Sequence, residues 1–269
     1  MTQVSDSVSE FETVRLERPA AGLAVVTLNR PDNGNGVVPE MARELMAIFM
    51  ALEDDAAMRA VVITGAGRHF SAGADLFALN EYLAKELAEK QEPFNARVLF
   101  PVTQKIASSR LPMIAAVNGS ATAGGLDLAL ACDLRVASAT AKFGETYVKI
   151  GLAPANGGTW FLPRLVGSGK AAELALTGDI ISAEEALEIG LVNRVVPPDE
   201  LLPAALAIAG RIAANPWRAV EATKQALRAS WQLDLASAMN FGYWTTAALH
   251  YTDDFQGRVA SFVEKSGRR

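Results

Sequence analysis

A carboxylate and a pair of glycines stand close together in the stretch from Leu111 to Ser138. The apolar run from Met113 to Val117 predicts a buried strand, and Gly124-Gly125 then opens LDLALA, a run of strong helix formers. The first N–H groups of such a helix point outward at the positive end of its dipole, so an anion or a developing oxyanion can bind there. Asp127, the carboxylate of this stretch, lies in the same first turn.

The stretch from Ala60 to Leu76 repeats this design, with an apolar strand, a glycine-bearing turn and a polar helix start. Two such turns can offer two converging N–H donors, which is an oxyanion hole in outline. A purely structural explanation stays open at this point. Glycines also allow close packing, and Asp127 would complement the helix dipole by ~0.5 kcal/mol.

Composition narrows the class of protein. The chain has 269 residues, half of them hydrophobic and a fifth charged, with a formal net charge of -5, which is typical of a soluble globular protein. The acidic balance and the lack of a basic run argue against a nucleic-acid partner. Two histidines, His69 and His250, are too few for a histidine-rich metal site, so we expect no metal.

The cysteine count and the N-terminal residues predict the cellular compartment of the protein. The single Cys132 excludes an internal disulfide and fits a reducing compartment, and its apolar neighbours favour buried packing over a nucleophilic role. The N-terminus has no apolar core of a secretory signal and no arginine-rich transit pattern, and no apolar stretch reaches the ~18 residues of a membrane span. We therefore expect a cytoplasmic protein without a membrane partner.

The expected elements follow an irregular strand, strand, helix repeat. Strands are predicted at residues 14–16, 23–28, 60–64, 113–117, 134–137, 140–143 and 192–196, and helices at 39–54, twice between 75 and 110, and at 157–165, 170–176 and 183–189. Ser182 and Glu185 have the spacing of a capping box for the last of these helices. The pattern is not the regular alternation of a doubly wound nucleotide fold, and no glycine-rich phosphate loop occurs, which argues against NAD, FAD and ATP.

Pro197-Pro198 marks the expected domain boundary. Residues 1–197 would form the core with the active site, and residues 198–269 an all-helical C-terminal region with helices at 200–214, 216–230 and 233–250.

From about Val14 to Lys265 the chain resembles the crotonase superfamily, the enoyl-CoA hydratase/isomerase group. The motifs that carry the resemblance are long and in the family's order: NRP from Asn29, VVITGAGRHFSAGADL from Val61, IAAVNGSATAGGLDLALACDLRVAS from Ile114, KFGETYVKIGLAPANGGTWFLPRLVG from Lys142 and LTGDIISAEEALEIGLVNRVVP from Leu176. The resemblance implies an α/β fold, a superhelix of repeated β-β-α units with a helical C-terminal region for oligomerisation and CoA contact. It also implies a homotrimer or homohexamer and an acyl-CoA thioester as substrate.

The resemblance also assigns roles to particular residues. It implies that the N–H groups of Ala74 and Gly124 hold the thioester oxygen, on which the charge of an enolate-like state gathers. Coenzyme A would be part of the substrate rather than a separate cofactor. It would contact Arg30 and Lys265, with Phe262 beside the adenine. The alternative is that Arg30 and Lys265 are ordinary solvent-exposed cations that do not bind CoA.

The chain departs from the family's hydratase pattern at the acid/base pair. The family's hydratases use two glutamates that flank a water molecule, and this chain has Asp127 and Tyr147 at those positions. A tyrosine, with a reference pKa of about 10, is no resting base near neutral pH, but its hydroxyl can donate a proton or orient a water. Glu145 would face the same way as Tyr147 if this segment is extended. Alternatively, Glu145 is a surface carboxylate paired with Lys149.

The resemblance and the residues at the acid/base positions together predict an enoyl-CoA hydratase-like lyase of fatty acid metabolism. Asp127 would be the acid/base group, and Tyr147 or Glu145 would be its partner. Ala155 and Asn156 stand where other branches carry an aspartate, which argues against a covalent dehalogenase-like route and against the aspartate-dependent isomerases. The alternatives are a one-base enoyl-CoA isomerase, an acyl-CoA hydrolase of the same superfamily, or a non-catalytic acyl-CoA binder.

Overall fold

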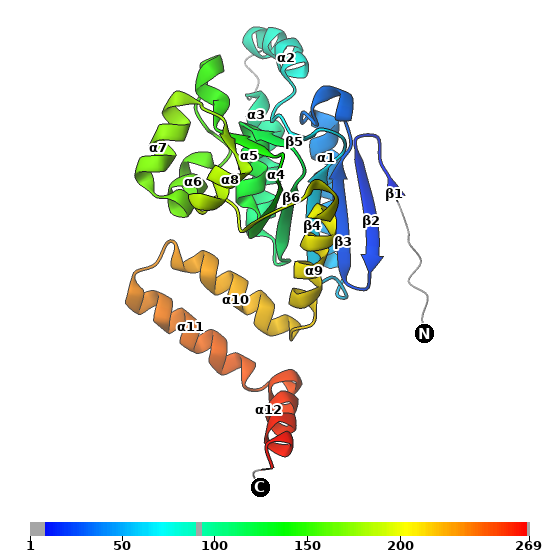
Figure 1. Cartoon of the computed structure of the whole chain (residues 1–269), viewed down its shortest axis with the longest axis vertical. Coiled ribbons are helices and arrows are strands. Elements are labelled where there is room, and N and C mark those ends of the chain that lie inside the picture. The colour runs from blue at the N-terminus through cyan, green and yellow to red at the C-terminus, as the bar shows by residue number, and fades with distance from the viewer. Residues whose placement is uncertain (1–8, 90–92, 268–269) are drawn as a thin grey trace. The chain divides into compact units, whose positions relative to one another are not determined.

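The computed structural model describes residues 9–89 and 93–267, which fall into two compact units. The first unit ends at Gly210 and the second begins at Arg211 (Figure 1). The expected boundary after Pro197 lies earlier, because most of helix α9 (Leu201–Ala213) belongs to the first unit.

A large sheet forms the core of the first unit. Within the described residues it has seven strands in the order β1 (Ser9–Glu10), β2 (Val14–Ala20), β3 (Leu23–Leu28), β4 (Ala60–Gly65), β6 (Met113–Val117), β8 (Leu134–Ser138) and β11 (Arg194–Val196). The strands from β3 onward are parallel, whereas β1, β2 and β3 pair antiparallel. All residues of β3 and β6 are buried, as their continuous apolar sequences require in a covered parallel sheet.

A smaller sheet supports the turns that follow the core strands. Its four described strands have the order β10 (Ile181–Ser182), β9 (Lys142–Gly144), β7 (Ser120–Thr122) and β5 (His69–Ser71). The pairs β4 and β5, β6 and β7, and β8 and β9 each give one strand to each sheet and then lead into a helix. The expected crotonase-like superhelix of repeated β-β-α units is therefore confirmed.

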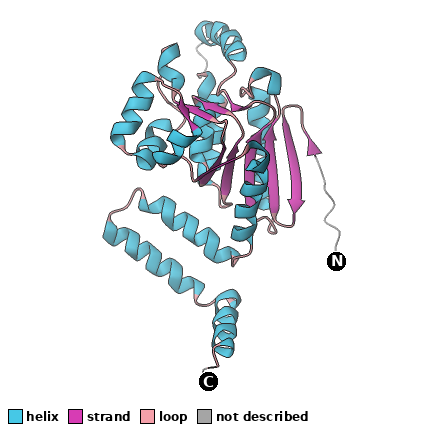
Figure 2. Cartoon of the chain, viewed as in Figure 1, coloured by secondary structure: helices cyan, strands magenta, loops and turns pink. Residues whose placement is uncertain are grey.

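Helices pack around these sheets (Figure 2). Helix α1 (Pro39–Asp54) contacts α4 (Leu99–Ser108), α4 contacts α5 (Gly124–Ala131), α5 contacts α6 (Gly158–Val166), and α6 contacts α7 (Ser168–Thr177). The predicted capping box of Ser182 and Glu185 opens α8 (Ala183–Glu188). The remaining elements of this unit are α2 (Leu76–Glu89), α3 (Phe94–Arg97) and the 3-10 helices η1 (Pro31–Asn33), η2 (Thr146–Ile150) and η3 (Pro198–Glu200).

The second unit consists of helices α10 (Trp217–Ser230), α11 (Leu235–Leu249) and α12 (Asp253–Lys265). The predicted all-helical C-terminal region is confirmed, but α12 was not among the expected helices. Its start has a clear signal, because Thr252 caps it and two aspartates follow in its first turn. Within the described parts of the chain, no helix is long and apolar enough to cross a membrane.

Candidate active site

The start of α5 is a crowded turn that only glycine fits. A Cβ on Gly125 would lie closer than 3.0 Å to the carbonyl oxygen of Ser71, and one on Gly124 would collide with the side chain of Leu99. Ala123, just before them, has a positive φ of 47°, which is strained for a residue with a side chain. Close packing therefore requires the glycine pair, and the same crowding holds the helix start in one position.

A second turn lies directly against the first. Gly73 has a φ of 93°, and a Cβ there would lie 2.8 Å from the backbone nitrogen of Gly124. The neighbouring backbone is fixed by hydrogen bonds from Val37 N to Gly73 O and from Asp75 N to Val37 O. Among the described residues, the backbone N–H groups of Ala74 and Gly124 have no backbone acceptor. Two neighbouring N–H groups in adjacent turns can together bind one oxygen with a partial negative charge.

A cavity of about 480 Å³ opens beside these turns. Ala74 and Ala123 line it together with Asn33 and Asp75 from the N-terminal segments and Tyr147 from η2. A neighbouring cavity of about 400 Å³ is lined by residues of α2, and it shares Leu76, Leu79, Ile150 and Leu152 with the first cavity. The space next to the two N–H groups is therefore polar on one side and apolar on the other.

Three buried polar side chains form a chain of hydrogen bonds behind the cavity wall. The Tyr147 hydroxyl donates to Oδ2 of Asp127 at 2.6 Å, and the amide of Asn156 donates to the Tyr147 oxygen at 2.8 Å. Asp127 is fully buried and does not line the cavity, whereas Tyr147 does. The Tyr147 oxygen would lie 3.3 Å from a Cβ on Gly124, which puts the hydroxyl beside the start of α5.

Burial governs the ionisation of this group. Desolvation raises the pKa of Asp127 to about 6, although the hydrogen bond from Tyr147 counteracts part of the effect. Desolvation and the nearby Asp127 charge raise the pKa of Tyr147 well above its ordinary value. At neutral pH the site therefore holds a neutral phenol that donates to an ionised carboxylate.

Glu145 lies beside Asp127, but not for the expected reason. The segment is not extended: Thr146–Ile150 forms η2, and Glu145 precedes it with a ψ of 68°. The alternative of a surface carboxylate paired with Lys149 is also wrong, because Glu145 is fully buried while Lys149 is exposed. Desolvation and the charge of Asp127 raise the pKa of Glu145 to about 9, so this carboxyl is neutral at pH 7.

Arg30 is held in the loop that leads into the cavity. Its guanidinium donates to the carbonyl of Gly36 at 2.6 Å and to Oδ2 of Asp75 at 2.7 Å. Oδ1 of Asp75 accepts from the N–H groups of Phe77 and Ala78 at the start of α2. Arg30 thus ties this loop to α2, and a contact with CoA stays a prediction.

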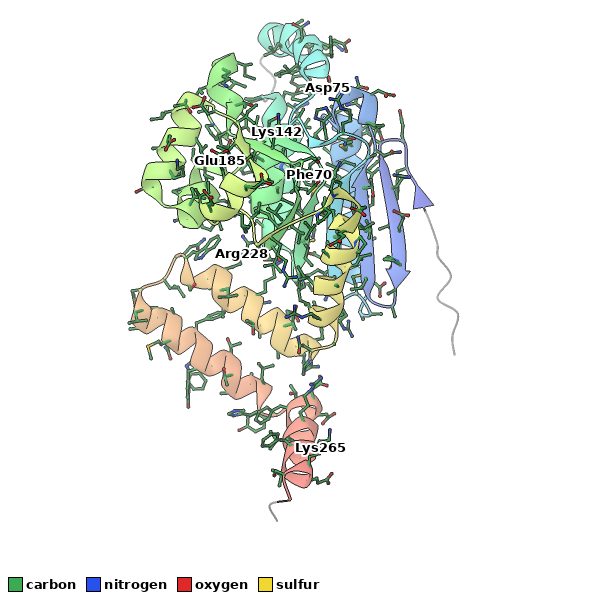
Figure 3. The ribbon with its side chains drawn as sticks, in the orientation of Figure 1. Phe70, Asp75, Lys142, Glu185, Arg228 and Lys265 are labelled. Atoms are coloured by element: carbon green, nitrogen blue, oxygen red, sulfur yellow. The ribbon has the colours of Figure 1, made fainter. Side chains whose placement is uncertain are left out.

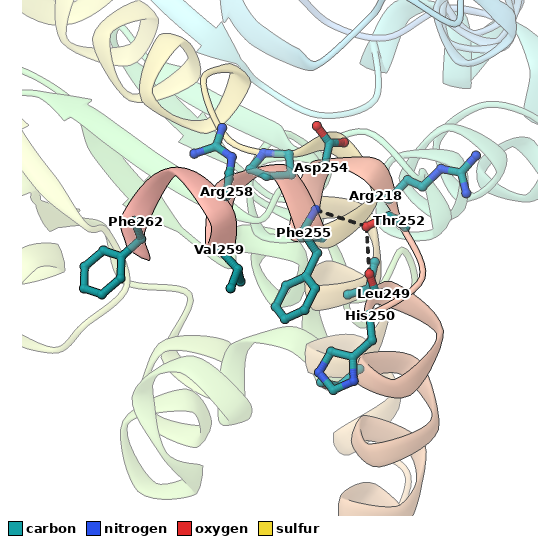
Figure 4. Close-up of a pocket in the computed structure, with 12 residues that line it drawn as sticks. Arg218, Leu249, His250, Thr252, Asp254, Phe255, Arg258, Val259 and Phe262 are labelled. Atoms are coloured by element: carbon teal, nitrogen blue, oxygen red, sulfur yellow. Dashed lines mark hydrogen bonds between the residues drawn. The ribbon is translucent and has the colours of Figure 1, made fainter. Parts of the chain in front are cut away.

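Phe262 lies on α12 in the second unit, and Lys265 is the last residue of that helix (Figure 3). Phe262 is 74% exposed and lines an apolar groove of about 410 Å³ within this unit, together with Leu249, Phe255 and Val259 (Figure 4). Thr252, at the turn from α11, accepts from Phe255 N and donates to the carbonyl of Leu249. The predicted contacts of Phe262 and Lys265 with CoA remain predictions.

Sequence reasoning missed Gly158 and the positive role of Asn156. In the sequence Asn156 stands out only because it replaces an aspartate, yet its amide donates to the Tyr147 oxygen. A Cβ on Gly158, the first residue of α6, would lie closer than 3.0 Å to carboxyl oxygens of both Asp127 and Glu145. The signal was present in the sequence, because Gly157-Gly158 opens a helix as Gly124-Gly125 does. In the described portion of the chain, no group of three or more His, Cys, Asp or Glu residues could hold a metal ion.

Comparisons with known proteins agree with this architecture. A crotonyl-CoA hydratase of Syntrophomonas wolfei is 40% identical over 256 residues, which are 95% of this chain and 96% of that protein. A short-chain-enoyl-CoA hydratase of Clostridium acetobutylicum is 38% identical over 257 residues, with coverages of 95% and 96%.

Solved structures are similar over nearly the same length. The enoyl-CoA hydratase of Bacillus anthracis has a TM-score of 0.87 at 33% identity and covers 94% of this chain and 97% of its own. That of Mycobacterium smegmatis has a TM-score of 0.87 at 34% identity, with coverages of 95% and 97%. The family model for enoyl-CoA hydratase/isomerase matches residues 18–268. This chain therefore belongs to the enoyl-CoA hydratase/isomerase family.

Proposed function

We propose that this enzyme adds water to the double bond of a 2-enoyl-CoA, with an altered acid/base pair. The hydrogen bond from Tyr147 to Asp127, at the cavity wall beside Gly124, is the observation that carries the proposal. The hydratase names of two relatives near 40% identity support the reaction type.

The N–H groups of Ala74 and Gly124 hold the thioester oxygen. Attack of water on C3 moves the electrons of the C2–C3 double bond onto this oxygen as an enolate, so these donors bind the transition state more tightly than the substrate. Loss of one such donor costs about 3 kcal/mol of transition-state stabilisation.

Tyr147 relays the proton between the substrate and Asp127. The water oxygen bonds to C3 while a water proton passes to the Tyr147 oxygen and the phenolic proton passes to Oδ2 of Asp127. The reverse relay returns a proton to C2, the enolate collapses, and the product is a 3-hydroxyacyl-CoA. Tyr147 begins and ends as a neutral phenol, so its high pKa is no obstacle, and Asp127 is the base.

Double-bond migration is the second candidate function. A one-base relay can also remove a proton from one carbon of the acyl chain and return it to another, and the same oxygen-binding donors would stabilise the dienolate. The single ionised carboxylate behind Tyr147 favours double-bond migration over hydrolysis. Hydrolysis would require water to attack the thioester carbon instead.

Mass spectrometry of the purified protein with crotonyl-CoA in heavy-oxygen water tests the proposal. A hydroxyacyl-CoA that carries the heavy oxygen supports hydration, and Asp127→Asn should abolish its formation with little change in CoA-ester binding. Conversion of a 3-enoyl-CoA without hydration would indicate an isomerase, and free CoA a hydrolase. Tight binding with no turnover, unchanged in Asp127→Asn, would indicate a binder.

Contacts with the nucleotide part of CoA belong to the same proposal. Arg30, Lys265 and Phe262 would hold it, and the enzyme would assemble as a homotrimer or homohexamer. Lys265→Ala should raise the KM for crotonyl-CoA but not for the crotonyl thioester of N-acetylcysteamine, which lacks the nucleotide. Light scattering of the purified protein reports the number of subunits.

A further inference from the structure

Glu145 is a buried carboxyl group that the proposed reaction does not use. Its side chain is fully buried at the start of η2, and within the described structure neither carboxyl oxygen has a hydrogen-bond partner. A buried carboxylate without a partner is strongly disfavoured, so the presence of this group needs a physical reason.

Oδ1 of Asp127 is a further buried oxygen that lacks a partner within the described residues. A Cβ on Gly158 would lie closer than 3.0 Å both to this atom and to Oε1 of Glu145, so the two oxygens face the same point. Two ionised carboxylates in this arrangement repel each other, whereas a carboxylic acid can donate its O–H to a carboxylate. One proton between the two groups therefore gives both oxygens a partner.

The proton belongs on Glu145 rather than on Asp127. Oδ2 of Asp127 accepts the Tyr147 hydroxyl, and the nearby N–H groups of Asn156 and Gly158 also favour its charged form. Among the residues that the structure describes, Asp127 on α5 and Tyr147 on η2 are the ionisable groups that face this site, and α6 contributes Gly158, which has no side chain. The nearby cations Lys142 and Lys149 are exposed and give Glu145 no countercharge.

We propose that Glu145 is a positioning residue, a neutral carboxylic acid that donates its O–H to Oδ1 of Asp127 and keeps Oδ2 charged and directed at the Tyr147 hydroxyl. Its effect on turnover rests on the proposed function. The shared proton is a property of the resting protein and can be tested without a substrate.

Infrared difference spectra between variants and the unaltered protein test the shared proton. We expect the carbonyl stretch of a protonated carboxylic acid at neutral pH, its loss in Glu145→Gln and its shift in Asp127→Asn. Glu173→Gln is the matched control, because Glu173 is an exposed carboxyl on α7 and its replacement should leave the band in place. A band that persists in Glu145→Gln, or no such band at neutral pH, would overturn the proposal.

The pH profile of kcat/KM separates positioning from packing. Glu145→Leu donates nothing to Asp127, so we expect a loss of about 10- to 100-fold and an acidic limb moved to higher pH. Glu145→Gln still donates an N–H and should recover most of that loss, without the alkaline limb that ionisation of Glu145 adds. Matching profiles for the two variants would overturn the positioning role. If no enoyl-CoA is turned over at all, the proposed function fails, while the infrared band still decides where the proton lies.

Discussion

The hydroxyl of Tyr147 donates a 2.6 Å hydrogen bond to Oδ2 of Asp127, which lies twenty residues earlier in the chain. Tyr147 lines the cavity and Asp127 lies behind it, fully buried. The buried carboxylate can therefore exchange protons with a molecule in the cavity only by way of the Tyr147 hydroxyl. A residue that is a poor acid and a poor base by itself gains acid/base chemistry from the group to which it is bonded.

Tyr147→Phe should stop the relay without unfolding the protein. The change removes one oxygen and leaves Oδ2 of Asp127 without its donor, so we expect kcat/KM to fall by about 10²- to 10⁴-fold. Binding of a CoA ester, measured by calorimetry, should change little. Tyr251→Phe, which removes an exposed hydroxyl, is the control. Full turnover in Tyr147→Phe would mean that water reaches Asp127 directly.

Much of the fold follows from local sequence signals. Continuous apolar runs gave β3, β4 and β6, and helix α1 begins and ends where its amphipathic period predicts, at Pro39 and Asp54. Each signal acts within a few residues, which is why it can be read without the rest of the chain. The resemblance to the family supplied the long-range order that local patterns do not contain.

The environment of Glu145 could not be predicted in this way. A short 3-10 helix, rather than an extended segment, places both Glu145 and Tyr147 in the interior. The space that the Glu145 carboxyl occupies depends on Gly158, thirteen positions beyond it in another element. Whether a carboxyl is buried, and so whether it is charged, is decided by such distant packing and not by neighbouring residues.

Glu145→Gln should flatten the dependence of stability on pH. The pKa of Glu145 is raised from 4.5 to about 9 in the folded protein, so the native state holds this proton more tightly than the unfolded chain. Its contribution to stability is complete below pH 4.5 and is lost as pH rises through about 9, by up to about 1.4 kcal/mol per pH unit. An uncharged amide has no such dependence. Urea unfolding across this range measures the slope, and the same slope in both proteins would contradict the assignment.

Arg30→Met should destabilise the protein through the loop that Arg30 holds. The guanidinium bonds to Gly36 and Asp75, and Asp75 is 6% exposed, so its carboxylate would remain buried without its cation. We expect a loss of about 1–3 kcal/mol in the free energy of unfolding, measured with urea. Arg43→Met breaks an exposed pair with Glu40 and should cost less than about 1 kcal/mol. Equal losses in the two variants would show that the Arg30 contacts are no more than surface pairs.

Gly158→Ala tests whether the two carboxyl groups need the space that this glycine leaves. The backbone of Gly158 is not left-handed, and alanine is the better helix former by up to about 1 kcal/mol, so the helix itself should tolerate the change. The added methyl would nevertheless lie closer than 3.0 Å to oxygens of Asp127 and Glu145 and force them apart.

Gly169→Ala is the matched control, because Gly169 is also in the first turn of a helix and its Cβ would meet no atom within 4 Å. We expect Gly169→Ala to raise the melting temperature and leave kcat unchanged. We expect Gly158→Ala to lower both the melting temperature and kcat, with kcat reduced about 10-fold or more because the Asp127 carboxylate moves away from Tyr147. If the two variants changed the melting temperature and kcat in the same way, the carboxyl pair would not depend on the space at Gly158.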